Sequence, residues 1–146
     1  MNILIINGPS LNLLGKREPE IYGTMSYGEL VKNLETYCED RHIDVDIKQT
    51  NLEGIMIDML HYASHMGFDA VVLNAAAFTH YSYAIYDAIK AIEVPVYEVH
   101  LSDPDTRDET FRHTSVIRSA CKATFKGEGI MSYKKAIDAI VDKTEG

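Results

Sequence analysis

Short apolar runs separated by longer amphipathic stretches make up most of the chain. The runs at residues 3–6 and 70–73 are apolar on both faces, which is typical of parallel strands buried inside a sheet. Residues 43–47 instead alternate between apolar and charged side chains, which indicates a strand with one solvated face near a sheet edge. Two further strands are predicted at residues 94–99, where Pro95 is tolerable only near the beginning, and at residues 121–125.

The stretches between these runs carry helical spacing. Ser26 and Glu29 have the spacing of a capping box, and apolar residues follow at helical intervals, so a helix is predicted to run to about residue 41. Further helices are predicted at residues 52–65, 81–92 and 132–143, with a short helical segment around 111–119 and a turn at 127–129. We expect the inner stripe of the second helix to consist of Ile55, Met56, Met59, Leu60 and Ala63.

Strict alternation of strands and helices predicts an α/β fold. Short connections between such elements are typical of a parallel sheet with helices on both faces, that is, three layers. Five strands favour the flavodoxin-like, doubly wound order 2-1-3-4-5. No linker, repeat or low-complexity tract interrupts the 146 residues, so we expect one domain spanning residues 1–146.

Composition narrows the class of protein. A formal net charge of −8 argues against nucleic acid as a partner, since phosphate binding needs clustered Lys and Arg. The longest uncharged apolar run, residues 70–78, is too short to cross a bilayer, and no signal-peptide pattern follows Met1, so we expect a cytoplasmic protein without a membrane partner. Cys38 and Cys121 lie far apart with no C-x-x-C pair, which indicates buried reduced thiols.

Polar residues follow several predicted strands where each strand ends. In open α/β sheets ligands bind beyond the carboxyl ends of the strands where the winding reverses, here between the first and third strands. Residues 8–25 form a long segment without helical or strand period, which compact domains usually keep for function. We therefore expect one site built from Asn7, Asn12, Arg17, Tyr22, Asn74, Thr79, His80, Glu98, His100 and Ser102.

Two pairs in this set indicate acid–base chemistry. Glu98 and His100 are two apart on one strand, so they point to the same side and can form a general acid; the alternative is a histidine satisfied at a strand end. Tyr22 could act as a base only with help, because a free phenol has a pKa of about 10. A cation such as Arg17 within about 4–6 Å would lower that pKa, although the segment could equally be a solvated surface loop.

Other motifs indicate no cofactor. His61 and His65 lie in H-Y-A-S-H, which lacks the glutamate of a zinc motif, so solvated histidines are expected and no metal is predicted. The G-E-G at residues 127–129 follows the last strand and is a turn, and there is no Walker A loop. Tyr81, Tyr83 and Tyr86 cluster at a helix start, where we expect packing or a subunit contact.

Six blocks of the sequence together resemble the type II 3-dehydroquinate dehydratases. The blocks keep the order and spacing of that family and extend over essentially the whole chain. They are N-G-P-S-L-N-L-L-G at 7–15, R-E-P-E-I-Y-G at 17–23, Q-T-N-L-E-G at 49–54, N-A-A-A-F-T-H at 74–80, E-V-H-L-S at 98–102 and F-R-H at 111–113.

The resemblance implies a flavodoxin-like lyase of the shikimate pathway, which leads to aromatic amino acids. It would convert 3-dehydroquinate to 3-dehydroshikimate by eliminating water through an enolate, without a cofactor. Tyr22 would be the base, Arg17 would stabilise the phenolate and enolate, and His100 would be the acid. Glu98 would orient His100, and Asn12 would hold an ordered water near the enolate oxygen.

The resemblance also implies substrate contacts and an assembly. Asp87 would reach in from a neighbouring subunit of a homododecamer built as a tetramer of trimers. The substrate contacts within the chain would be Asn74, His80 and Arg112 for ring hydroxyls and the backbone of Leu101 and Ser102 for the carboxylate.

The sequence departs from the family pattern at several positions. Ser10 stands where Asn is expected, and Ala75, Ala76 and Phe78 stand in a block that often reads N-P-G-A-Y-T-H. Ala76 would narrow the turn after the third strand if that position needs a positive φ. Asp103 replaces a frequent Asn and would add negative charge near a carboxylate site.

Three alternatives stay open. A flavodoxin-like binding or signalling module would bind flavin or carry paired aspartates where this chain has N-G-P at residues 7–9. A degenerate family member would serve as a structural or interaction protein, against which the intact Arg17, Tyr22, His100 and Arg112 count. A different dehydratase that uses a lysine Schiff base would lose activity with borohydride plus substrate.

Overall fold

Five parallel strands form the centre of the computed structural model, which describes residues 1–16, 18–22 and 24–145. The strands are β1 (Asn2–Asn7), β2 (Asp44–Gln49), β3 (Ala70–Asn74), β4 (Val96–Val99) and β5 (Ala123–Phe125). Their order is β2-β1-β3-β4-β5, and every neighbouring pair is parallel. The predicted flavodoxin-like order is confirmed, and β2 lies at an edge as its alternating pattern indicated.

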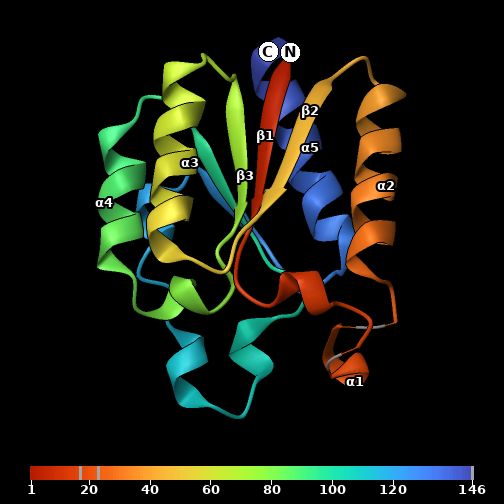
Figure 1. Cartoon of the computed structure of the whole chain (residues 1–146), viewed down its shortest axis with the longest axis vertical. Coiled ribbons are helices and arrows are strands. Elements are labelled where there is room, and N and C mark those ends of the chain that lie inside the picture. Colours follow the sequence, from red (N-terminus) through yellow and green to blue (C-terminus); the bar gives the residue numbers. More distant parts are fainter. Residues whose placement is uncertain (17, 23, 146) are drawn as a thin grey trace.

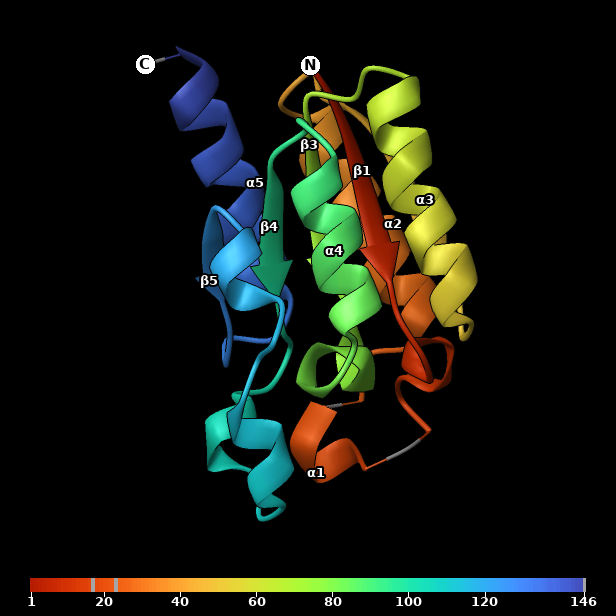
Figure 2. The ribbon, with the colours of Figure 1, turned by 90° about the vertical axis from the view of Figure 1, so that its left-hand side faces the viewer.

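Helices cover both faces of the sheet. The helices α2 (Tyr27–Glu39) and α5 (Ile130–Glu145) lie on one face, and α3 (Glu53–His65) and α4 (Tyr83–Ala91) lie on the other (Figure 1). The short helix α1 (Pro19–Tyr22) and the 3-10 segments at Pro104–Thr106 and Thr110–His113 lie beyond the carboxyl ends of the strands, as Figure 2 shows from the side. These three short elements therefore lie together at one end of the sheet.

The two faces of β1 supply two separate cores. Ile3 and Ile5 pack with α2 and α5, whereas Leu4 and Ile6 pack with α3 and α4. Successive side chains of a strand point to opposite faces, so a strand covered on both sides must be apolar at every position. The continuous runs of β1 and β3 satisfy this requirement, and each of these four side chains is fully buried.

Local hydrogen bonds explain where the helices begin. The hydroxyl of Ser26 accepts a hydrogen bond from the Glu29 N–H at 3.1 Å, so the predicted cap is confirmed. The helix predicted from residue 81 begins later, because the chain first makes a 3-10 turn at Ala76–His80 and Ser82 then caps α4. The segment at residues 8–25 contains α1 and a 3-10 turn at Leu11–Leu13, which are too short to show a period in the sequence.

One packing prediction was wrong. Ile55 is 41% exposed and does not belong to the inner stripe of α3, whose buried members are Met56, Leu60 and Ala63. Helical periodicity alone did not separate the flank of this stripe from its centre. Tyr81 and Tyr83 are 58% and 70% exposed, and the Tyr81 ring meets Phe78 edge to face, so the predicted choice between packing and a subunit contact stays open for them.

Other surface features of the described residues are simple. His61 and His65 are exposed, as predicted. Cys38 is buried and Cys121 is half-buried, and both are free thiols. Among the described helices, none combines the length and apolar character that a membrane crossing requires.

The carboxyl end of β3 meets the loop after β1 at very short range. The Gly8 N–H donates to the Asn74 carbonyl at 2.8 Å, and a Cβ on Gly8 would lie 2.7 Å from the Ala75 carbonyl oxygen. Only glycine permits this approach. The next residue of the turn, Ala76, has a φ of 51°, a left-handed conformation that costs an ordinary L-residue about 1–2 kcal/mol.

Replacing Ala76 by glycine is therefore expected to stabilise the fold. Glycine removes the strain of the left-handed conformation in the folded state, although it also adds conformational entropy to the unfolded chain. The first effect is larger, so the free energy of unfolding should rise by about 0.5–1 kcal/mol. Thermal or denaturant unfolding of Ala76→Gly measures this change. Ala75→Gly is the matched control, because Ala75 has a φ of −76° and is fully buried, and that variant should lose stability instead. Equal destabilisation of both variants would contradict the strain argument.

Candidate functional site

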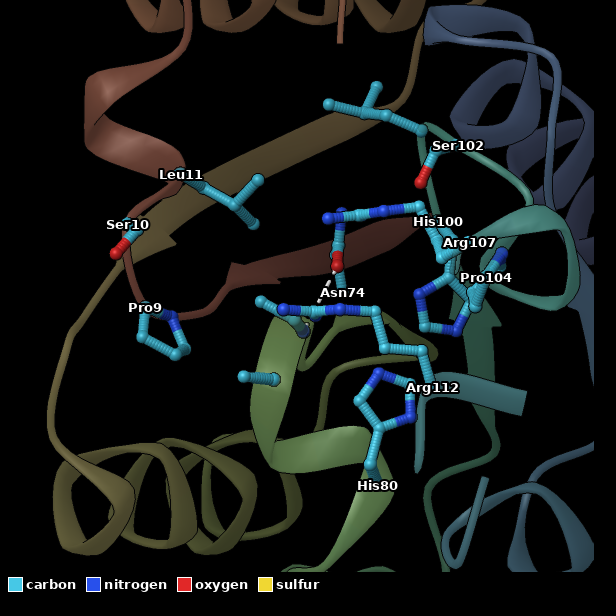
Figure 3. Close-up of a pocket in the computed structure, with 13 residues that line it drawn as sticks. Pro9, Ser10, Leu11, Asn74, His80, His100, Ser102, Pro104, Arg107 and Arg112 are labelled. Carbon is cyan, nitrogen blue, oxygen red and sulfur yellow. Dashed lines mark hydrogen bonds between the residues drawn. The ribbon is translucent and has the colours of Figure 1, made fainter. Parts of the chain in front are cut away.

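A cavity of about 130 Å³ lies at the carboxyl edge of the sheet, between the ends of β3 and β4. The side chains of Arg107, Arg112, His80 and His100 converge on it, with Asn74 at the end of β3 (Figure 3). Leu101 and Ser102 also line it. The predicted convergence of polar groups from several strands at this edge is therefore present in the structure.

Glu98, on β4, lies behind His100 and is fully buried. Its Oε2 accepts from His100 Nε2 at 2.6 Å and from the Ser115 hydroxyl at 3.0 Å. Its Oε1 accepts from Arg118 Nε at 3.1 Å and from the Thr124 hydroxyl at 3.0 Å, and Arg118 Nη2 adds a contact of 3.3 Å to Oε2. The predicted pairing of Glu98 with His100 is present, together with three further donors that the sequence did not indicate.

These donors keep Glu98 ionised inside the protein. Burial by itself raises the pKa of the carboxyl, but the hydrogen bonds and positive charges of His100 and Arg118 together outweigh it and lower the pKa to about 2. A carboxylate can only accept hydrogen bonds, so His100 Nε2 must carry a hydrogen. The other ring nitrogen, Nδ1, is then the one that can exchange a proton with a ligand in the cavity.

His80 is fixed on the opposite wall of the cavity. Its Nδ1 lies 2.8 Å from the Thr114 carbonyl, which can only accept, so Nδ1 donates. Burial lowers the pKa of His80 below its ordinary value, although the hydrogen bond to Thr114 opposes this shift. A neutral ring held in this way leaves Nε2 as an acceptor for a ligand hydroxyl. The Val116 N–H donates to the Thr79 carbonyl at 2.9 Å and ties the same segment to this turn.

Two arginines bring positive charge into the cavity. The Arg112 guanidinium forms an ion pair with Glu109 at 3.4 Å, and its buried Nε has no hydrogen-bond partner among the described residues. Arg107 is almost buried and lies 3.6 Å from the Glu18 carboxylate. Guanidinium groups bind carboxylates and hydroxyls well, so these two side chains suit a polar anionic ligand. Arg107 was not predicted from the sequence. It stands in the polar stretch after β4, outside any motif, and its position there was the only indication that the sequence offered.

Asn74 connects the cavity to a buried network. Its side-chain N–H donates to the Tyr133 hydroxyl at 2.9 Å, and that hydroxyl donates to Asn7 at 2.6 Å. Its side-chain oxygen accepts from the Ala76 N–H. Asn7 and Asn74 thus fix the ends of β1 and β3 to one another through α5.

The loop after β1 is held by the end of β2. The Gln49 side-chain N–H group contacts the Gly8 carbonyl at 3.1 Å and the Asn12 side-chain oxygen at 3.3 Å. The Ser10 N–H donates to Asn51 at 2.9 Å, and Ser10 itself has a left-handed φ of 69°. Asn12 is exposed and does not line the cavity, so its predicted role at the site remains a prediction.

A broader cleft of about 890 Å³ adjoins the cavity. It lies between α1 and the segment after β4, and it shares Leu101, Ser102 and Arg107 with the cavity. Arg17 lies outside the described residues, and of Tyr22 only the backbone, at the end of α1, is described. The segment predicted to carry the base therefore borders the cleft that opens into the cavity.

Two charged positions of the prediction lie elsewhere. Asp87 lies on α4 and does not line the cavity of this chain. The Asp103 carboxylate accepts from the Asp105 N–H and lies 3.2 Å from Lys126 Nζ, so its negative charge is paired rather than directed at the cavity. Among the described residues no cluster of three His, Cys, Asp or Glu side chains could hold a metal ion.

A flavodoxin-like sheet with a carboxylate-bound histidine and two arginines at its carboxyl edge defines a small α/β protein with an acid–base site for a polar anion. Residues 1–141 match the family described as Dehydroquinase class II. The chain belongs to this family, and the resemblance stated from the six sequence blocks is confirmed.

Individual relatives agree with this assignment. A 3-dehydroquinate dehydratase of Caldicellulosiruptor bescii is 47% identical over 138 residues, 94% of each chain. One of Bacillus licheniformis is 48% identical over 136 residues, 93% of this chain and 92% of the other. The crystal structure of a type II dehydroquinase from Butyrivibrio crossotus superposes with a TM-score of 0.94 at 44% identity, covering 96% of this chain and 97% of the other.

Proposed function

We propose that this chain is a 3-dehydroquinate dehydratase that eliminates water from 3-dehydroquinate to give 3-dehydroshikimate, in the shikimate pathway. The observation that carries the proposal is the Glu98–His100 pair facing a cavity that also holds Arg107 and Arg112. Family membership and the names of the relatives support the same substrate and reaction.

The elimination needs a base, a stabiliser for an enolate and an acid. A base takes the proton from the carbon next to the ketone, and the electron pair moves onto the carbonyl oxygen to form the enolate. The enolate then reforms the ketone and expels the hydroxyl group of the neighbouring carbon. That hydroxyl leaves as water after it receives a proton from His100 Nδ1.

The base in this proposal is Tyr22, assisted by Arg17. A phenol becomes a useful base near neutral pH only beside a cation, because lowering its pKa by one requires about 1.4 kcal/mol of favourable interaction with the phenolate. Arg17 would supply this charge, and Asn12 would hold a water near the enolate oxygen. The contact between Asn12 and Gln49 supports a fixed position for that side chain beside the cleft.

The remaining contacts would orient the ring. Asn74, His80 and Arg112 would bind its hydroxyl groups. The Leu101 carbonyl accepts a hydrogen bond from the Gly129 N–H at 2.9 Å, which fixes the peptide plane that also carries the Ser102 N–H. The N–H groups of Leu101 and Ser102 would hold the substrate carboxylate. Among the described residues that line the cavity none is a lysine, so Schiff-base chemistry is disfavoured.

The whole chain would act as one domain, in the cytoplasm, within a homododecamer made of four trimers. Asp87 would reach the site of a neighbouring subunit. Exposed apolar side chains on the α3 and α4 side, namely Leu52, Ile55, Tyr81 and Tyr83, support an interface there. Light scattering on the purified protein tests the assembly, and a monomer at working concentration would contradict it.

Incubation of the purified protein with 3-dehydroquinate tests the proposed reaction. The product contains a conjugated enone, so ultraviolet absorbance should rise with time in proportion to the protein. Activity should persist after treatment with borohydride plus substrate. No absorbance change at saturating substrate would exclude the proposed function, and loss of activity with borohydride would favour a lysine mechanism.

Arg112→Gln is expected to weaken substrate binding more than turnover. If the guanidinium contacts the ligand equally in the ground and transition states, KM should rise about tenfold or more while kcat changes little. Steady-state kinetics measures both constants. Arg41→Gln, at an exposed position just after α2 and outside the cavity lining, is the matched control and should leave both constants unchanged. An unaltered KM for Arg112→Gln would exclude the contact.

A further inference from the structure

Arg118 holds the same carboxylate that orients His100. It binds Glu98 side-on through Nε and Nη2, at 3.1 Å and 3.3 Å, and does not itself line the cavity. Burial lowers the pKa of Arg118, but the hydrogen bond and charge of Glu98 outweigh it and raise that pKa, so Arg118 stays positively charged. One buried negative charge therefore faces a guanidinium and an imidazole, and the guanidinium keeps its proton under all conditions in which proteins fold.

The sharing of this charge has an electrostatic consequence. A carboxylate beside a histidine favours the imidazolium form, and an additional cation on the carboxylate weakens that effect. We propose that Arg118 is a positioning residue that, by sharing the charge of Glu98, limits how tightly His100 holds the proton it delivers. The proposal rests on the acid role of His100 in the proposed function. It explains why the acid can release its proton although it donates to a buried carboxylate at 2.6 Å.

Other charged groups also surround this pair. Arg107 and Arg112 line the same cavity as His100, and their positive charges act in the same direction as that of Arg118, whereas the carboxylate of Asp105 acts in the opposite direction. The ionisable or charged groups of the described residues that face His100 and its Glu98–Arg118 partners are His80, Arg107, Arg112, Asp105 and Cys121. None of these described groups is hydrogen-bonded to Glu98, whereas Arg118 is, so Arg118 shares the charge of the carboxylate by direct contact.

The chain also offers a control for a merely structural role. The Thr124 hydroxyl donates to the same oxygen of Glu98 as Arg118 Nε, at 3.0 Å, but carries no charge. Loss of the Thr124 bond would loosen the carboxylate without altering the charge around it. Arg118→Met removes the charge and keeps much of the side-chain volume, and Arg118→Lys keeps the charge.

Two measurements test the proposal. In Arg118→Met, the alkaline midpoint of the kcat pH profile should move upward by about 1 pH unit, and kcat at pH 7 should fall about three- to tenfold while KM stays the same. A pH titration followed by nuclear magnetic resonance should show the same upward movement of the His100 titration midpoint without any substrate. The protein would be labelled at the histidine rings, and a His100→Asn variant would assign the His100 signal. In Arg118→Lys and in Thr124→Val, His100 should titrate at the same pH as in the wild-type protein.

The outcomes separate this inference from the proposed function. An unmoved His100 titration in folded Arg118→Met, or an equal shift in Thr124→Val, would overturn the role of Arg118. An upward shift of the His100 titration midpoint in Arg118→Met supports the role of Arg118 even if the protein fails to turn over 3-dehydroquinate. That failure would refute only the proposed function. If Arg118→Met does not fold, Arg118→Gln, which keeps hydrogen-bond donors without the charge, gives the same readout.

Discussion

The Tyr22→Phe variant is expected to fold normally and to lose turnover by about 10²- to 10⁴-fold, the usual contribution of a positioned base. The change removes only the phenolic hydroxyl that the proposal assigns as the base. The ultraviolet assay at saturating 3-dehydroquinate measures kcat, and circular dichroism verifies the fold. Tyr62→Phe, on exposed α3, is the matched control and should retain activity.

Retained turnover in Tyr22→Phe would show that another group takes the proton. A rise in KM with kcat unchanged would instead show that the hydroxyl only binds substrate. Either result would leave the acid at His100 standing, because its position depends on β4 and on Glu98 rather than on the α1 segment.

The free energy of unfolding is expected to fall by about 3 kcal/mol as Glu98 becomes protonated in acid. The pKa of Glu98 in the fold is about 2, below its ordinary value of 4.5, so its contribution is fully present above pH 4.5 and is lost as the pH falls toward 2. Denaturant unfolding between pH 7 and pH 2 measures this slope. Glu98→Gln should be less stable at pH 7, because it leaves Arg118 without its carboxylate, and should show a shallower slope.

Glu98→Gln should also reduce kcat by at least about tenfold, since the amide cannot stabilise the imidazolium form of His100. Glu35→Gln, on the exposed face of α2, controls for the loss of one negative charge. If the free energy of unfolding fell equally with pH in Glu98→Gln and in the wild-type protein, other carboxyl groups would dominate acid unfolding.

The sheet was predictable because burial on both faces leaves a direct pattern. Strands such as residues 70–73 must be apolar throughout, and the alternating charges at residues 43–47 place their strand at an edge. The Glu98–His100 pair was also predictable, since residues two apart on a strand share one side. Ser26 marked a helix start through its own local hydrogen bond.

Other features depend on contacts between distant parts of the chain. Arg118 meets Glu98 because a 3-10 turn at Arg118–Ala120 brings it beside β4, and no spacing in the sequence encodes that meeting. Arg107 likewise lies at the cavity because short turns place it there, and no sequence spacing encodes that position. Ile55 is exposed because it lies at the margin of the apolar face of α3, which the sheet does not cover. A helical period shows which side of the helix is apolar, but not how wide the covered part is.

The cavity has a floor and a roof of different origin. The floor consists of strand ends, with His100 after β4 and Asn74 on β3 anchored to buried partners. The roof carries Arg107 and Arg112 on short 3-10 turns after β4. In the proposed reaction the acid is thus anchored to a strand end, whereas two of the cations that suit an anionic ligand lie on turns. We expect exchanges of these two arginines to change which acid is bound without disturbing the contact between Glu98 and His100.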